Sequence, residues 1–332
     1  MGKIRIGTRE SQLAIWQATQ LKNMLAENGQ ESELVFIKSE GDVDLVTPLY
    51  DIGVQGIFTR ALDAALLSNK IDVAVHSMKD VPVQLAKRIK QAAVLKRGSY
   101  KDILVPHPHV FNVSTILGHI TIAQTESNTK ESDQATHENT EEGVDVIVAT
   151  SSIRRIAQWS RRYPHHKIEN LRGNVNTRLR KLKQSKWQGA IFAAAGLERI
   201  GLRPDNAVEL DWMLPAPAQG AIMVVCREDD EDAFKSCKIF NHVETALCTK
   251  IERDFLSALM GGCSTPISAL AEIKDGQVHF KGNILSPDGH QIAESSSIKP
   301  IKDAGDSGFI GAKNILVNGG QAIIDKMKNV TK

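Results

Sequence analysis

The sequence predicts an α/β protein that ends in a separate α+β segment. Through the first 240 residues, short apolar runs rich in β-branched residues alternate with stretches of helical periodicity, an order typical of mostly parallel sheets. Beyond residue 266 the pattern changes to three consecutive strand-like runs, and Asp275-Gly276 between the first two is a hairpin signal. We therefore expect mixed, mostly parallel sheets first and an antiparallel sheet last.

Composition describes an ordinary globular protein of more than one domain. At 332 residues with 42% hydrophobic content, the chain is long enough for two or three cores. The formal net charge of +2 gives no global signal for nucleic acid or a membrane. The N-terminal residues lack the apolar core of a signal peptide, and no run of about 18 apolar residues occurs. We expect a cytoplasmic monomer that binds neither nucleic acid nor a membrane.

The N-terminal part supplies strands and helices in turn. Ser11 has the position of a helix N-cap, and apolar residues recur at helical spacing until Asn28 and Gly29. The segment 39–56, with three glycines and one proline, is long for a connection and typical of a lid. Strands are expected at 3–6, 34–37, 71–75, 92–95 and 103–105, and a second helix at 59–68.

The remaining elements follow a polar insertion. Residues 124–142 are almost all polar or acidic and cannot bury enough surface to become ordered, so we expect a disordered insertion at about 107–143. Pro215, Pro217 and Gly220 indicate a hinge at which the chain returns to the first domain. Strands are expected at 144–149, 189–193, 221–226, 267–273, 278–285 and 292–298, and helices at 229–241, 242–260 and 307–327.

One polar cluster follows the apolar run that starts at Ile71. His76, Ser77, Lys79 and Asp80 come together at the end of this strand, before Pro82 stops it. In open α/β sheets ligands bind outside the carboxyl ends of the strands, so an ammonium and a carboxylate there indicate a site. The alternative is a solvated turn in which Lys79 and Asp80 pair in water.

A second polar cluster is strongly basic. The strand expected at 144–149 ends in Thr150, Ser151 and Ser152, followed by Arg154 and Arg155. Between residues 151 and 186 there are eleven Lys or Arg residues and a single acidic one. Guanidinium groups suit carboxylates, whereas the scarcity of aromatic residues gives little support for single-stranded nucleic acid. A solvated basic helix face explains the lysines at 181, 183 and 186 equally well.

The four cysteines form no CxxC pair, which argues against a zinc site or a disulfide framework. Cys263 follows two glycines on a turn between a helix and a strand, where a thiol can act as a nucleophile. The alternative for a lone cysteine is a small buried apolar residue.

Nine motifs occur in the order of one known family. They are TRESQLAIWQA, GD with TPL, HSMKDVPV, ATSSIRR, LRGNVNTRL, AAAGLERIGL, AQGAI, HVETAL and GGCSTP. With them the chain resembles the hydroxymethylbilane synthase (porphobilinogen deaminase) family over nearly its whole length except 106–143. The resemblance implies two domains like those of periplasmic binding proteins and a third that carries the cysteine. The corresponding ranges are 1–101 with 216–240, 102–215, and 241–332.

The resemblance also implies a reaction and a set of site residues. The family joins four porphobilinogen molecules head to tail, with release of ammonia, on a dipyrromethane primer held by a thioether; Cys263 matches the attachment point and Asp80 the catalytic carboxylate. Positions that match the family's carboxylate-binding and hydrogen-bonding residues are Arg9, Ser11, Ser77, Lys79, Thr150, Ser151, Ser152, Arg154, Arg155, Arg172, Arg178, Arg199 and Gln219. The lid positions are Gly41, Asp42, Gln55 and Arg60.

The lid departs from the family pattern. Gln55 and Asp51 stand where lysines are common and Ala61 where an acidic residue is, although Arg60 keeps a positive charge. A weakened family member that holds tetrapyrrole, or a non-enzymatic binding protein for small carboxylates, are the alternatives.

Overall fold

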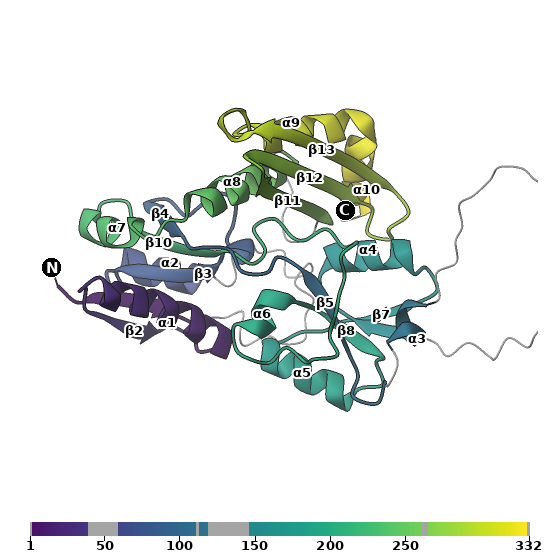
Figure 1. Cartoon of the computed structure of the whole chain (residues 1–332), viewed down its shortest axis with the longest axis horizontal. Coiled ribbons are helices and arrows are strands. Elements are labelled where there is room, and N and C mark those ends of the chain that lie inside the picture. The colour runs from purple at the N-terminus through teal and green to yellow at the C-terminus, as the bar shows by residue number, and fades with distance from the viewer. Residues whose placement is uncertain (1, 39–58, 111–112, 119–145, 260–264, 331–332) are drawn as a thin grey trace, which may run out of the picture.

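The computed structural model describes residues 2–38, 59–110, 113–118, 146–259 and 265–330. These residues form three β-sheets with helices packed on them (Figure 1). Two sheets have five strands each and the third, near the C-terminal end, has three. The predicted fold class, two α/β domains with mixed, mostly parallel sheets plus an antiparallel C-terminal sheet, is confirmed. Within the described part of the chain, no helix has the length and apolar character needed to cross a bilayer.

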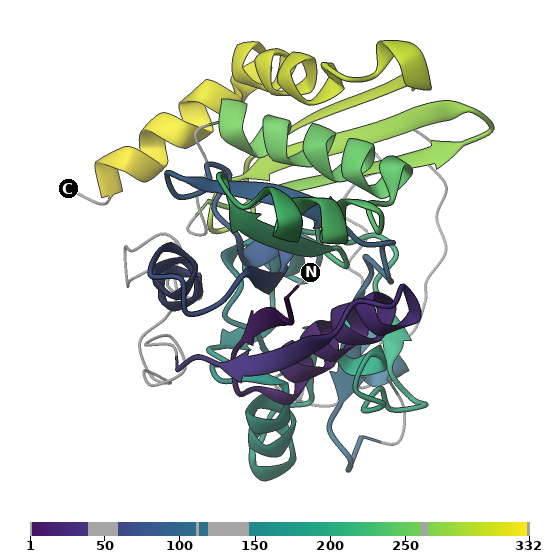
Figure 2. The same ribbon diagram turned by 90° about the vertical axis from the view of Figure 1, so that its left-hand side faces the viewer.

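The first sheet has the strand order β2-β1-β3-β10-β4. β1, β2 and β3 are parallel, and β10 runs antiparallel to both of its neighbours. Helices α1 and α2 cover opposite faces, because α1 shares a core with Val73 and Val75 while α2 shares one with Ala74 (Figure 2). The elements are β1 (Ile4–Thr8), α1 (Gln12–Glu27), β2 (Ser32–Phe36), α2 (Arg60–Leu67), β3 (Val73–Ser77), β4 (Ile89–Val94), β10 (Ile222–Arg227) and α7 (Glu231–Lys238).

The second sheet repeats this arrangement in the order β7-β6-β8-β5-β9. β6, β7 and β8 are parallel, and β5 is antiparallel to both of its neighbours. In each five-stranded sheet the fourth strand of the order, β10 or β5, runs opposite to the others. The chain reaches each of these two strands directly from the other sheet. The elements are β5 (Asp102–Pro106), α3 (Ser114–Leu117), β6 (Ile147–Ala149), α4 (Ile153–Arg162), β7 (Lys167–Glu169), α5 (Val175–Gln184), β8 (Gly189–Ala193), α6 (Ala194–Glu198) and β9 (Val208–Glu209).

Two crossover segments, 95–101 and 210–221, connect the sheets and lie side by side. The N–H of Gly98 donates to the carbonyl of Gly220 over 3.0 Å, and Gln219 Nε2 donates to the carbonyl of Tyr100 over 2.7 Å. Gly220 has a φ of +85°, and a Cβ there would lie 2.5 Å from the carbonyl oxygen of Ser99. This close approach and the positive φ require glycine at position 220, where the chain returns to the first sheet as expected, while hinge motion there stays a prediction.

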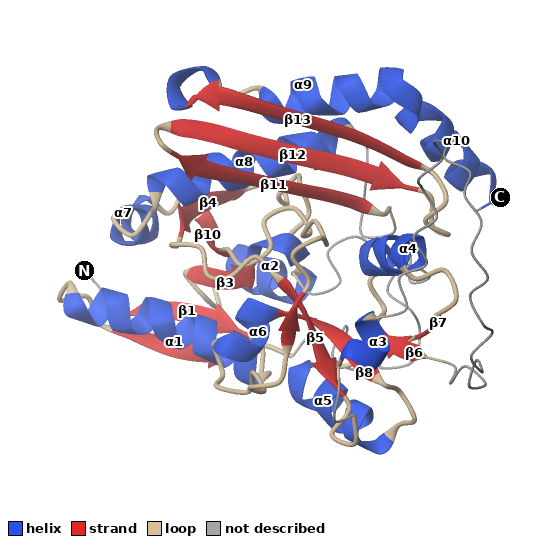
Figure 3. Cartoon of the chain, turned by 45° about the vertical axis from the view of Figure 1, so that its right-hand side comes forward, coloured by secondary structure: helices blue, strands red, loops and turns tan. Residues whose placement is uncertain are grey.

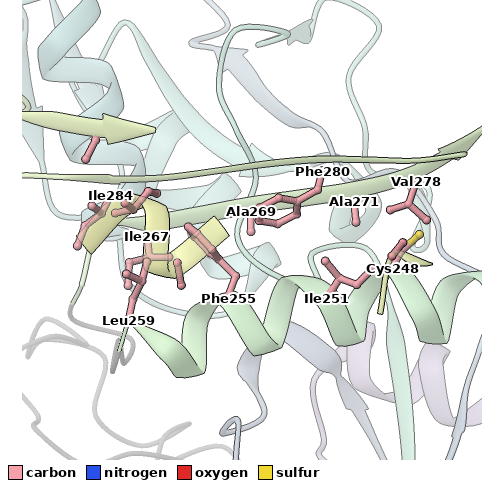
Figure 4. Close-up of a cluster of buried hydrophobic side chains, with 14 of the residues drawn as sticks. Cys248, Ile251, Phe255, Leu259, Ile267, Ala269, Ala271, Val278, Phe280 and Ile284 are labelled. Atoms are coloured by element: carbon pink, nitrogen blue, oxygen red, sulfur yellow. The ribbon is translucent and has the colours of Figure 1, made fainter. Parts of the chain in front are cut away.

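The third sheet is the predicted meander, in the order β11-β12-β13 (Figure 3). Asp275 and Gly276 both have positive φ, as a tight hairpin turn requires. Its core contains Phe255 and Phe280, whose rings meet edge to face at 5.3 Å (Figure 4). The elements are α8 (Val243–Ala258), β11 (Ile267–Lys274), β12 (Gln277–Leu285), β13 (Ile292–Pro300), the short helix Ile301–Asp303, α9 (Ser307–Ile315), the turn Leu316–Gly320 and α10 (Gln321–Val330).

Some expected elements differ from the structure. The single helix predicted at 307–327 is wrong: Asn318 and Gly319 leave the helical conformation and separate α9 from α10. The short strands β7 and β9 and the helix α3 were not expected. Ile116 of α3 is fully buried, so the expected insertion starts later than residue 107, because apolar residues such as Val110 and Ile116 join the core of the second sheet. Residues 124–142 lie outside the described part of the chain.

Helix α8 attaches the third sheet to the crossovers. Glu252 is fully buried and accepts a forked pair of hydrogen bonds from Arg97, at 2.6 and 3.1 Å. The same carboxylate accepts from the N–H groups of Ala218, in the second crossover, and Ala271, in β11. One carboxylate thus ties together a helix, a strand and both crossovers.

Asp102, the first residue of β5, is a second buried carboxylate at the crossovers. It accepts from Arg154 Nη2 at 2.7 Å, from Arg155 Nη2 at 2.8 Å and from Gln219 Nε2 at 2.9 Å. Asp102 itself is fully buried. It therefore holds the start of α4 against the point where the two sheets are joined.

We expect Asp102→Asn to lower the free energy of unfolding by about 3 to 5 kcal/mol, because it leaves two buried guanidinium groups without their counter-charge. Urea denaturation at neutral pH measures the change. Asp211→Asn is the control, since that carboxylate is exposed and pairs with Lys101, and an exposed pair contributes at most about 1 kcal/mol. Equal midpoints for Asp102→Asn and the wild type would contradict the assigned role.

Candidate active site

Most of the predicted site residues lie at the carboxyl ends of four parallel strands. Arg9 and Ser11 follow β1, Lys79 and Asp80 follow β3, and the basic segment around Arg154 follows β6. Arg199 lies at the end of α6, just after β8. These strands occupy matching places in the two five-stranded sheets, so the fold turns two polar clusters that are distant in sequence toward one region.

The turn after β3 places Lys79 and Asp80. Met78, Lys79 and Asp80 form one turn of 3₁₀ helix, in which Met78 is buried in the core and the other two are partly exposed. The N–H of Met78 donates to the carbonyl of Ala221 over 3.0 Å, which fixes the turn to the second crossover. Met78 therefore fixes the turn in the core, and Lys79 and Asp80 remain accessible at the site.

Lys79 lies among charges of both signs. Its Nζ donates to Gln219 Oε1 over 3.2 Å. Burial lowers the pKa of Lys79 to about 8, the Asp80 carboxylate opposes that shift, and Arg155 adds to it. The ammonium of Lys79 therefore interacts electrostatically with Asp80 on the same turn and with Arg154 and Arg155 on helix α4.

Arg154 and Arg155 are held in place from several sides. Besides Asp102, Arg154 Nη1 donates to the carbonyl of Leu214 at 2.8 Å, and Arg155 Nη1 donates to that of Ile191 at 2.9 Å. Burial alone would raise the pKa of Asp102, but Arg154, Arg155 and Lys79 outweigh it and lower that pKa to about 2. Arg154 Nε is buried and has no hydrogen-bond partner among the described residues.

The LRGN turn brings two more arginines to the same place. Gly173 has a φ of +113°, and its carbonyl accepts from Arg178 Nε over 2.7 Å. Burial lowers the pKa of Arg178 to about 10, with Arg155 and Arg172 acting in the same direction and Asp80 in the opposite one. Asp80, from the first sheet, therefore lies within electrostatic reach of Arg178 and its arginine neighbours in the second.

The predicted hydroxyl groups have varied surroundings. Ser11 Oγ accepts from the N–H of Ala14 as the α1 cap, and Ser151 Oγ donates to the carbonyl of Leu171. Thr150 Oγ1 accepts from the N–H of Ser152, whose own side chain makes no capping bond at the start of α4. The hydroxyl group of Ser152 is therefore better placed to donate a hydrogen bond to a ligand than the hydroxyl group of Ser151, which already donates to the carbonyl of Leu171.

Gln17 was missed by the sequence analysis, as was Asp102, and His76 was named in the first polar cluster without being given a role. Gln17 of α1 is buried and donates to Ser77 Oγ over 2.9 Å, so it orients a predicted site hydroxyl. His76 is also buried; burial, with Arg9 acting in the same direction, lowers its pKa to about 4, and the imidazole is neutral at pH 7. No local pattern marks Gln17 or Asp102 as functional, since their partners are distant in sequence.

Arg199 lies between the sheets. Its Nη2 donates to the carbonyl of Gly220 over 2.6 Å, and its guanidinium lies 5.6 Å from the centre of the Trp16 ring. Gln219 is fully buried between the crossovers. Both residues therefore belong to the junction of the two α/β domains. Arg60 is exposed at the start of α2, and the other predicted positions, Gly41, Asp42, Gln55 and Cys263, lie outside the described residues.

The donor set fits an anionic group with several carboxylates. Lys79, Arg154, Arg155, Arg172 and Arg178 gather around two carboxylates, Asp80 and Asp102. The cluster therefore carries more positive than negative charge at neutral pH. Within the described part of the chain, no group of three His, Cys, Asp or Glu residues is arranged to hold a metal ion.

Comparison with known proteins gives one consistent family. The solved structure of the methionine binding protein MetQ is 13% identical with a TM-score of 0.41 over 72% of this chain and 89% of that one, too weak a likeness to carry an argument. A family model described as porphobilinogen deaminase, dipyromethane cofactor binding domain, matches residues 4–235, and a model of the porphobilinogen deaminase C-terminal domain matches residues 246–317.

Two curated relatives align over most of their length. The chain is 36% identical over 328 residues to a porphobilinogen deaminase from Syntrophomonas wolfei, which covers 98% of both proteins. It is 39% identical over 307 residues to the chloroplastic porphobilinogen deaminase of Oryza sativa, which covers 90% of this chain and 78% of the relative. The chain therefore belongs to the porphobilinogen deaminase family.

Proposed function

We propose that this protein joins four porphobilinogen molecules head to tail into hydroxymethylbilane, with release of ammonia, on a dipyrromethane primer attached to Cys263. The observation that carries the proposal is the position of Asp80 beside a basic cluster contributed by a different sheet. The family matches over residues 4–235 and 246–317 support it. The monomeric state, the cytoplasmic location and the domain ranges stay predictions from the sequence.

Asp80 is the catalytic residue in this proposal. Loss of ammonia from the aminomethyl group of porphobilinogen leaves positive charge that is shared with the pyrrole nitrogen. A carboxylate next to that nitrogen stabilises the developing charge and can accept or return a proton. Asp80 is partly exposed and so accessible to substrate, whereas Asp102 is fully buried and occupied by its arginines.

The arginines and Lys79 bind carboxylates. Each pyrrole unit carries an acetate and a propionate, so the bound negative charge grows with every addition. Planar guanidinium forks bind carboxylates through paired hydrogen bonds, and Arg154 and Arg155 are held rigidly enough to do so without losing much side-chain freedom. Arg9, Arg172, Arg178 and Arg199 have the same role, with Ser11, Ser77, Thr150, Ser151, Ser152 and Gln219 as hydrogen-bonding groups.

The cofactor, when attached, supplies the pyrrole carbon that the first substrate unit joins. Cys263 follows α8 in the sequence, four residues after Leu259. The three described cysteines are buried, and burial raises the pKa of Cys226 and Cys248 to about 11 and that of Cys237 to about 12. They stay protonated at pH 7 and are poor nucleophiles, which favours Cys263 for the thioether.

Intact-protein mass spectrometry tests the proposal. The protein from cells that make haem should be heavier than its sequence by one dipyrromethane unit, because the primer is covalent. Cys263→Ser should abolish the added mass, whereas Cys237→Ala, at a buried position of the first domain, should keep it. An unmodified mass for the wild type, together with no release of ammonia from porphobilinogen, would overturn the proposed function.

Asp80→Asn should lower kcat by about 100-fold or more, because the amide can neither stabilise the developing charge nor relay a proton. The primer mass and the melting temperature should stay those of the wild type, since Asp80 is at the surface of the site and not in a core. Steady-state kinetics with porphobilinogen measures the loss. Normal turnover in this variant would remove Asp80 from its role.

The pKa of Lys79 gives a pH dependence. Because its pKa is lowered to about 8, the ammonium loses its proton as the pH rises from 7 to 9, and the attraction for substrate carboxylates weakens. We expect KM for porphobilinogen to increase across that range in the wild type. Lys79→Arg should remove the increase, because the guanidinium stays charged. The same rise in KM for both proteins would assign it to another group.

A further inference from the structure

Arg253 of α8 binds the main chain that follows Asp80. Its Nη1 donates to the carbonyl of Val81 at 2.9 Å, and its Nη2 donates to those of Pro82 at 2.6 Å and Val83 at 3.0 Å. A longer contact of 3.4 Å reaches the carbonyl of Met78. Arg253 is buried, so one buried guanidinium supplies hydrogen bonds to the carbonyls of several neighbouring residues.

On the side of α8 the segment after Asp80 packs through Val81 and Leu85 but also borders a cavity. A cavity of about 410 Å³ lies there, with Val83, Leu85 and Lys250 among the residues that line it. Pro82 has no N–H to donate to a neighbouring strand. Removing the guanidinium would leave the buried carbonyl of Val81 and the partly buried carbonyls of Pro82 and Val83 without this donor, beside a cavity into which the segment can move.

α8 is itself firmly attached. Glu252, the residue before Arg253, binds Arg97 and the N–H groups of Ala218 and Ala271, as described above. The helix lies between the C-terminal sheet and the first sheet (Figure 1). It ends at Ala258, five residues before Cys263. Arg253 therefore connects the Asp80 turn to the helix that leads to the proposed attachment point.

We propose that Arg253 is a positioning residue for the proposed reaction: its guanidinium fixes the main chain at 81–83, so that Asp80 stays beside Lys79 and Arg178 while the product grows. The inference rests on the proposed function and deepens it. Arginine is needed because a planar fork reaches carbonyls of three successive residues, whereas an ammonium is a single compact charge. Arg253 acts through Asp80 and makes no contact with substrate.

Arg253→Lys and Arg253→Met test the inference in the primer-loaded enzyme. A displacement of Asp80 by about 1 Å should lower kcat by about 10- to 100-fold and change KM much less, because Asp80 acts in the chemical step whereas Arg154, Arg155, Arg172 and Arg178, which bind substrate carboxylates in the proposed function, are on the second sheet. Arg253→Lys keeps the charge and part of the hydrogen bonding, so it decides the test if Arg253→Met is insoluble. The primer mass should be retained.

Arg227→Lys is the matched control. Its guanidinium is also largely buried and donates to two main-chain carbonyls, those of Leu66 at 3.1 Å and Ile71 at 2.7 Å, but at the opposite end of β3 from Asp80. We expect a lower melting temperature for Arg227→Lys with kcat unchanged. If Arg253→Lys behaves in the same way, Arg253 is merely structural and the inference is overturned.

A double-mutant cycle with Asp80→Asn completes the test. If Arg253 acts through Asp80, adding Arg253→Lys to Asp80→Asn should reduce kcat no further than Asp80→Asn alone. Multiplicative losses would overturn the inference, because they show that the two residues act independently. A wild-type protein without primer or turnover would instead overturn the proposed function. That outcome differs from an active wild type whose kcat does not change in Arg253→Lys, which would overturn only the inference about Arg253.

Discussion

The buried carboxylate of Asp102 holds Arg154 and Arg155 together at the junction of the two α/β domains. Two guanidinium groups in a protein interior repel each other. Each has also lost its hydration, which costs several kcal/mol per group unless a counter-charge offsets it. Asp102 supplies that charge, and Gln219 connects it to the second crossover. The position of the basic helix relative to the rest of the molecule is thus set where the chain passes between the sheets.

The excess of positive charge around Asp80 follows from this arrangement. Asp102 neutralises only part of the charge of Arg154 and Arg155, and Arg172, Arg178 and Lys79 add to it. Burial is the main cause of the lowered pKa of Lys79, and the arginines of α4 act in the same direction. Such a cluster is costly in an isolated protein, and the cost is offset when a ligand with several carboxylates binds. The family's cofactor and substrate have that chemistry.

The third domain contributes more than a place for Cys263. Through Glu252 it binds both crossovers, and through Arg253 it binds the main chain beside Asp80. Gln158 of α4 also donates to Ser268 of β11 over 3.0 Å, so the C-terminal sheet contacts the second domain as well. A shift of the C-terminal domain would therefore displace the crossovers and the turn that carries Asp80, the carboxylate proposed to be catalytic.

The sequence by itself determined the features that depend on nearby residues. Strand and helix periodicity, the Ser11 cap, the Asp275-Gly276 hairpin and the polar clusters after β3 and β6 are all local patterns, and the structure has each of them. The broken final helix was predictable too, because Asn318-Gly319 is a turn signal that was outweighed by apolar periodicity. Family motifs then assigned Asp80 and the arginines the roles that the proposed function gives them.

Only the tertiary structure decided which charges meet. Asp102 lies 52 positions before Arg154, Gln17 lies 60 before Ser77, and Arg253 lies 172 after Val81, so no spacing rule connects these pairs. Their contacts exist because the chain leaves the first sheet, returns to it beside its own exit and then packs a helix against both crossovers. A strand is specified by its own residues, whereas the partner of a buried charge is specified by topology, since only the folded chain excludes the water that would otherwise solvate it.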